Sequence, residues 1–129
     1  MEFPNIQTKA TSLTLTDALV DLLEKRLQTL GKLLPEDETS ISCDVELEKI
    51  TDHHQTGKIY RAEINLRIGG KLYRAESTEE RIEDAIDRAK NDLKTELRRS
   101  KDKRQSLMRR GGQKLKDLIR FGQIGRAHV

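Results

Sequence analysis

Residues 60–76 read YRAEINLRIGGKLYRAE, and this stretch decides the fold. Apolar and polar residues alternate from Tyr60 to Ile68, which predicts a strand with one buried face. Gly69-Gly70 then predicts a tight hairpin turn, because glycine readily adopts the positive φ angles that such turns require. A shorter strand is expected over residues 71–76, so the stretch predicts two antiparallel strands.

Two further strands and a helix are predicted ahead of this hairpin. Residues 40–50 alternate in the same way, and residues 3–9 form a shorter candidate strand. Between them, leucines recur at spacings of three and four residues from Leu19 to Leu30, a pattern typical of an amphipathic helix. The candidate N-caps of this helix are Thr14 and Thr16, and its end is marked by Gly31 and Pro35.

A long helix is predicted after the hairpin. Ser77 and Glu80 have the spacing of a capping box at its start. Its apolar stripe consists of Ile82, Ala85, Ile86, Ala89, Leu93 and Leu97. The stripe stops at Leu97, but no helix breaker occurs until Gly111-Gly112, so we expect residues 98–110 to project past the body and to be exposed. The order β-α-β-β-β-α predicts an α+β fold, in which two helices pack on one face of a four-stranded, mostly antiparallel sheet.

The charge of the chain is divided unevenly. Residues 1–97 hold 14 Lys and Arg against 20 Asp and Glu, a net of −6, whereas residues 98–129 hold 11 against 2, a net of +9. An acidic body with a basic end indicates a polyanionic partner, although a solvated basic tail with no particular partner has the same composition. We expect a single domain over residues 1–104 and a basic, flexible tail over 105–129. The last six residues, 124–129, also resemble the translation of a sequencing-adapter read.

No catalytic signature stands out, and we expect neither enzymatic activity nor a cofactor. His53-His54 beside Asp52 suggests a metal site, but adjacent histidines point in different directions and no further Cys or His has helpful spacing, so no metal is expected. Cys43 alternates with apolar residues and is expected to be a small buried side chain. A single cysteine, no basic and apolar leader, and no apolar run of membrane-spanning length favour a cytoplasmic protein.

The basic residues of the long helix are the strongest candidate site. Spacings of three and four residues bring Lys90, Lys94, Arg98 and Lys101 to one side, and Arg99, Lys103 and Arg104 extend the set. Such residues bind phosphates through counterion release and read little sequence. Because the chain has only two Phe and two Tyr, folded or double-stranded RNA is a better match than stacked single strands.

Charge alone leaves other partners open. DNA is one, and an anionic membrane is another, because the segment 114–121 is itself amphipathic. Two other kinds of protein have the same features: a generic double-stranded-RNA-binding module, and a protein-interaction adaptor whose basic helix docks on an acidic partner.

The order of the elements and several segments resemble the ribosome hibernation-promoting factor family. The segments are LEKRL at 23–27, YRAEINL at 60–66 with the Gly-Gly hairpin after it, EERIEDAID at 79–87 and LKTELRR at 93–99. The resemblance covers roughly residues 1–104. It implies a non-enzymatic factor that binds the small ribosomal subunit in the mRNA and tRNA channel, at the A and P sites, and inhibits translation by steric occlusion.

The resemblance also implies which residues contact rRNA. In this sequence the matching basic positions are Arg26 on the first helix and Arg99 and Lys103 on the second. Lys90, Lys94, Arg98, Lys101 and Arg104 are added by the charge pattern. The chain departs from the family at Glu83, where an aromatic residue is common, and at Thr95, where a basic one is. We expect the protein to be a monomer when it is not on the ribosome.

Overall fold

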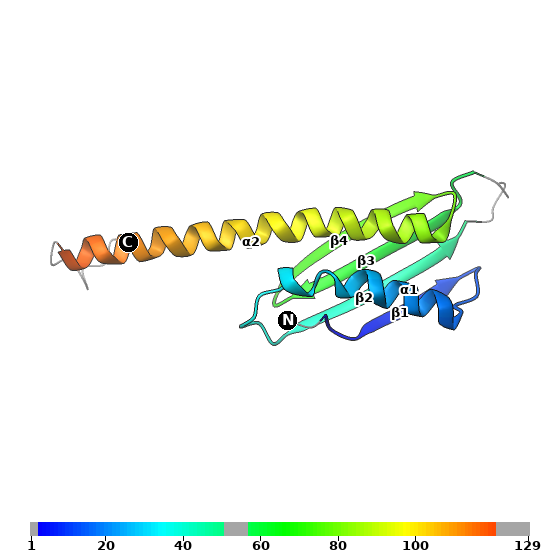
Figure 1. Cartoon of the computed structure of the whole chain (residues 1–129), viewed down its shortest axis with the longest axis horizontal. Helices are drawn as coiled ribbons and strands as arrows, with labels where there is room; N and C mark the ends of the chain where they lie inside the picture. Colours follow the sequence, from blue (N-terminus) through cyan, green and yellow to red (C-terminus); the bar gives the residue numbers. More distant parts are fainter. Residues whose placement is uncertain (1–2, 51–56, 121–129) are drawn as a thin grey trace.

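A computed structural model describes residues 3–50 and 57–120, and for residues 112–120 it describes the backbone helix alone. Its elements, shown in Figure 1, follow the predicted order: β1 (Ile6–Thr11), α1 (Asp17–Gln28), the short 3₁₀ helix η1 (Gly31–Leu33), β2 (Ile41–Lys49), β3 (Tyr60–Ile68), β4 (Lys71–Glu79) and α2 (Ile82–Arg120).

The four strands form one sheet in the order β1-β2-β3-β4. β1 and β2 are parallel, whereas β2, β3 and β4 pair antiparallel. A parallel pair needs a crossover connection, and α1 supplies it. Both helices lie against the same face of the sheet (Figure 1), so the predicted α+β class and layer arrangement are confirmed.

Local signals in the sequence explain where several elements begin and end. Thr16 caps α1, because its hydroxyl accepts a hydrogen bond from the amide of Leu19 at 3.1 Å. Gly69 has a φ of +61°, which provides the turn between β3 and β4. Both of these predictions are confirmed.

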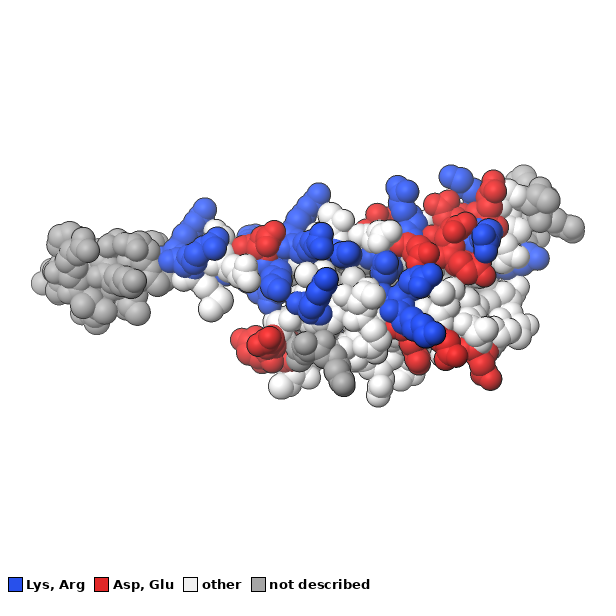
Figure 2. All heavy atoms as spheres, in the orientation of Figure 1, with Lys and Arg blue, Asp and Glu red and all other residues white. Residues whose placement is uncertain are grey.

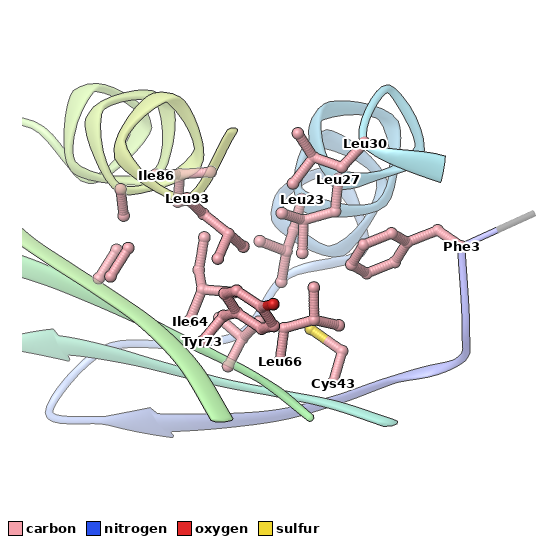
Figure 3. Close-up of a cluster of buried hydrophobic side chains, with 14 of the residues drawn as sticks. Phe3, Leu23, Leu27, Leu30, Cys43, Ile64, Leu66, Tyr73, Ile86 and Leu93 are labelled. Atoms are coloured by element: carbon pink, nitrogen blue, oxygen red, sulfur yellow. The ribbon is translucent and has the colours of Figure 1, made fainter. Parts of the chain in front are cut away.

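The core lies between the two helices and the covered face of the sheet. Figure 3 shows leucines of α1 and apolar residues of α2 meeting side chains of the strands. The largest fully buried side chains include Leu23, Leu27, Leu47, Ile64, Leu66, Ile86, Leu93 and Leu97. Phe3 closes the end of the core beside α1. Buried residues alternate with half-buried or exposed ones along the middle of β2, β3 and β4, and the helices leave the opposite face of the sheet, here called the open face, uncovered.

Two predicted boundaries differ from the structure. β1 runs from Ile6 to Thr11 rather than over residues 3–9. The capping box is wrong, because Ser77 lies inside β4 with a buried side chain and α2 begins only at Ile82. The reason is the length of β3: its first residue, Tyr60, pairs with Glu79, so β4 must continue to that residue.

α2 continues through the glycines where the sequence suggested a break. It has 39 residues and ends at Arg120. Its apolar stripe ends at the buried Leu97, as predicted. Contacts with the body nevertheless continue for about one more turn through polar groups: the Tyr73 hydroxyl and the Ser100 hydroxyl lie 2.6 Å apart, and the Lys101 ammonium donates to the carbonyl oxygen of Lys32 at 3.2 Å.

Some predictions lie outside the described residues. These are the candidate metal ligands Asp52, His53 and His54, and the segment 124–129. Within the described ranges, no cluster of three or more His, Cys, Asp or Glu side chains is arranged to hold a metal ion. No described helix is long and apolar enough to cross a membrane. The division of the chain at residue 104 stays a prediction.

Candidate nucleic-acid interface

The basic residues of α2 lie on two different sides of the helix. One side turns toward η1 and carries Lys90, Lys94, Arg98 and Lys101, which recur at three- and four-residue spacing. The other side turns toward the free edge of β4 and carries Arg99 and Lys103, since Arg99 and Lys103 line grooves shared with residues of β4. The structure therefore brings four of the predicted residues together and separates two from them.

The fold adds Lys32 to the first group. Lys32 lies in η1, and its carbonyl oxygen accepts the hydrogen bond from Lys101. We call the five residues Lys32, Lys90, Lys94, Arg98 and Lys101 the basic cluster. Sequence reasoning missed Lys32, because only the packing of η1 against α2 places it beside residues that follow it by more than 50 positions.

The charges of the basic cluster are not neutralised within the protein. In the described part of the chain, none of its five members has a carboxylate at ion-pairing distance, although α2 holds other ion pairs such as Arg88 with Asp92 and Arg99 with Glu96. The pKa of Lys94 is lowered, first by the charge of Arg98, then by partial loss of solvent and by the charges of Lys32 and Lys90. Like charges this close repel one another, and phosphates placed between them would relieve the repulsion.

Arg26 borders the basic cluster but is itself paired. Its Nε lies 2.7 Å from an Asp87 carboxylate oxygen, so the pair joins α1 to α2. Asp87 stands one turn before Lys90 on the same side of α2. Since about 40% of each side chain is exposed, the guanidinium of Arg26 still faces solvent beside the cluster.

Arg104 lies partly against the body and is half-buried. It follows Leu97 by seven residues, so it continues the buried stripe of α2. Its Nε is enclosed and has no hydrogen-bond partner among the described residues. It lines the clefts on both sides of α2 above the segment that contains Pro35 and Asp37. Arg104 is half-buried, as are Arg26, Lys90, Lys94 and Lys101, and it differs from them in its enclosed Nε.

The opposite, open face of the sheet is charged in a different way. Its acidic residues pair with arginines of the same face: Arg61 lies 2.8 Å from Glu63 and 3.2 Å from Glu48, and Arg74 lies 3.0 Å from both Glu63 and Glu76. The pKa of Glu63 falls to about 2, because Asn65, Arg74 and Arg61 all donate hydrogen bonds to its carboxylate. Around Arg61 and Arg74, this face neutralises its own charges.

The chemistry of Cys43 agrees with a structural residue. Its side chain is buried in the core. Burial, and then the neighbouring charge of Asp44, raise the pKa of the Cys43 thiol to about 12. A thiol with so high a pKa is a poor nucleophile. The predicted buried cysteine is confirmed.

Figure 2 shows how the charges are distributed on the side of the helices. Lys and Arg gather along α2 and over its contact with α1, whereas Asp and Glu gather near the start of α2. These features define a small α+β domain with a basic, helix-borne surface that suits a polyanionic partner.

Comparisons with known proteins agree with this class. The model of the family described as Sigma 54 modulation protein / S30EA ribosomal protein matches residues 6–105. The chain therefore belongs to this family, which is one of ribosome-associated proteins. No curated protein matches the chain.

Two solved structures are similar to the fold. The N-terminal domain of Protein Y from Thermus thermophilus shares 29% identity with a TM-score of 0.58, and the match covers 77% of this chain and 98% of that one. A ribosomal subunit interface protein from Coxiella burnetii shares 20% identity with a TM-score of 0.58, over 75% of this chain and 97% of that one. At that identity, the second likeness shows the fold alone.

Proposed function

We propose that this protein is a ribosome hibernation factor that binds the small ribosomal subunit in the mRNA and tRNA channel, at the A and P sites. It inhibits translation there by steric occlusion and acts in the cytoplasm. The observation that carries the proposal is the basic cluster, whose five charges have no described counter-charge, on a member of a ribosome-associated family.

The basic cluster supplies the affinity in this proposal. Its ammonium and guanidinium groups replace counterions along the rRNA backbone, which favours binding at low salt and reads shape more than sequence. Arg26 extends the contact onto α1, while Arg99 and Lys103 contact phosphates on the other side of α2. Arg104 contacts the same phosphates through the exposed part of its guanidinium.

Occlusion needs no chemistry from the protein. It needs a body that keeps its shape, and the sheet with its two helices encloses one continuous core. A rigid body pays little conformational entropy on binding, so most of the electrostatic gain appears as affinity. Among the described residues, no metal cluster is found, and burial makes the Cys43 thiol a poor nucleophile.

Co-sedimentation with vacant small subunits at rising salt tests the proposal. K94Q/R98Q removes two charges from the basic cluster. Its matched control, K9Q/R67Q, removes two exposed charges from the open face of the sheet. We expect K94Q/R98Q to weaken binding roughly tenfold or more and to reduce the slope of log affinity against log salt by about 1.5. The control should change affinity by less than about twofold.

Other outcomes would point to other functions. Absence of low-salt binding by the wild-type protein would contradict the proposal. A plain RNA duplex that competes as well as the subunit would favour a generic double-stranded-RNA-binding module. Binding that survives ribonuclease treatment would favour a protein-interaction adaptor.

A further inference from the structure

α2 is longer than its contacts with the body require. Met108 is its last described residue to line a cleft with the body, in a cleft that Pro35 also lines. Met108 is itself exposed, and so are the three residues after it, Arg109 to Gly111. The helix then continues to Arg120, so residues 108–120 form an arm that reaches about 20 Å from the body at 1.5 Å per residue. Figure 1 shows this arm extending past the sheet.

Such an arm gains little stability from itself. A helical segment of this length is marginal in water. Glycine at 111 and 112 disfavours the helix roughly fivefold each relative to alanine. The sequence has no acidic residue between Asp102 and Asp117, so no carboxylate within the first turns can offset Arg109 and Arg110. A partner that neutralises this charge would therefore stabilise the helical form.

We propose that residues 108–120 are a second RNA-binding element, which binds as a helix along phosphates that the basic cluster does not reach. The inference rests on the proposed function and deepens it. Charge complementarity selects the partner: the arm is basic, so a second copy of the same arm would be repelled, whereas an RNA backbone would be attracted. The exposed Arg109 and Arg110 start the contact where the body ends.

Gly111 offers a test that changes the helix and leaves the charge alone. A Cβ added at Gly111 meets no atom within 4 Å, so alanine introduces no clash. If the arm binds as a helix, G111A should bind vacant small subunits about two- to fivefold tighter, because less ordering opposes binding. G111P breaks the helix at the same position and should bind at least fivefold weaker.

Two measurements complete the design. R109Q/R110Q should weaken binding about tenfold and lower the salt slope by about 1.5, while leaving thermal unfolding unchanged. Amide hydrogen exchange of residues 108–120 in the wild-type protein should slow when the subunit is added, because the helix is then held by RNA.

Unchanged affinity in both G111A and G111P would overturn the inference while leaving the proposed function intact. Failure of the wild-type protein to bind subunits would instead contradict the proposed function, and the same pair of variants would then be compared on a 20-base-pair RNA duplex. If G111A and G111P change the affinity for anionic phospholipid vesicles but not the affinity for RNA, the choice of RNA as the partner would be overturned.

Discussion

The two sides of the sheet hold their charges in opposite ways. On the open face, Arg61 lies within ion-pairing distance of four carboxylates: Glu46 at 3.4 Å, Glu48 at 3.2 Å, Glu63 at 2.8 Å and Glu76 at 3.6 Å. On the side of the helices, the five residues of the basic cluster have no described carboxylate partner.

The difference separates charges that stabilise the fold from charges that serve a partner. A paired network contributes to folding, and removing one member leaves the others uncompensated. An unpaired cluster of like charge gives the folded protein nothing and is explained by an external polyanion. Substitutions in the ion-pair network around Arg61 should therefore change stability, whereas substitutions in the basic cluster should change binding.

The largest expected effect on stability is that of Arg61→Met. The side chain of Arg61 is only 17% exposed, so its loss leaves four neighbouring carboxylates repelling one another. We expect the free energy of unfolding to fall by about 2–3 kcal/mol, measured by urea denaturation at pH 7. Arg67→Met, on the exposed part of the same face, should change it by less than about 0.5 kcal/mol.

The affinity of the Arg61→Met variant for the small subunit should also be measured, because the comparison concerns both stability and binding. At a temperature where the variant is folded, its affinity should stay within about twofold of the wild type. A large loss of affinity with unchanged stability would mean that the open face, too, contacts the partner.

A smaller effect is expected for Glu63→Gln, and it should depend on pH. The pKa of Glu63 is about 2 in the folded protein against an ordinary value of 4.5, so its stabilisation is fully present above 4.5 and is lost as the pH falls toward 2. We expect the variant to be less stable than the wild type by about 1–2 kcal/mol at pH 7, with the difference shrinking between pH 5 and 2. A difference that stays constant over this range would show that the carboxylate is not the cause.

A second acidic residue serves as the control for a general loss of negative charge. Glu36→Gln changes an exposed residue of the loop after η1. Its free energy of unfolding at pH 7 should stay within about 0.5 kcal/mol of the wild type. The contrast between the two variants tests whether the hydrogen bonds from Asn65, Arg74 and Arg61 make Glu63 different.

Much of the fold follows from short-range patterns in the sequence. Alternation over Tyr60–Ile68 and the glycine turn gave the hairpin, and leucine spacing gave α1. The predictions that failed concern where elements end, which local patterns do not decide alone. Ser77 has a capping-box spacing, but the length of β3 keeps it in a strand. Gly111-Gly112 has low helix propensity, yet α2 continues past it.

The candidate site was predicted less completely than the fold. Periodicity grouped Lys90, Lys94, Arg98 and Lys101, because all four lie on one helix. It could not find Lys32, which packing brings from η1, or recognise that Arg104 lies partly against the body. The family resemblance supplied Arg26, but it could not show that Asp87 pairs with Arg26 from another helix.

The smallest expected effects are those of substitutions in the pair of Arg26 and Asp87. This pair lies between the internally paired charges and the unpaired basic cluster. Arg26 and Asp87 are about 40% exposed, so solvent screens their attraction and the pair contributes well under 1 kcal/mol to folding. R26Q and D87N should therefore leave urea denaturation almost unchanged, and they should differ in binding. R26Q should weaken binding to the subunit about threefold, because it removes a cation beside the basic cluster.

D87N should keep the affinity or raise it about twofold. The substitution removes a negative charge close to Lys90, and it frees the guanidinium of Arg26 from its ion pair, so both changes favour a polyanion. The sign of this effect assigns the pair. If both variants weaken binding equally, Arg26 acts through its position in the pair, and the contact between α1 and α2 belongs with the internally paired charges. If R26Q weakens binding and D87N strengthens it, Arg26 belongs with the basic cluster. An arginine that contacts the polyanion directly binds it better once the competing carboxylate of Asp87 is gone.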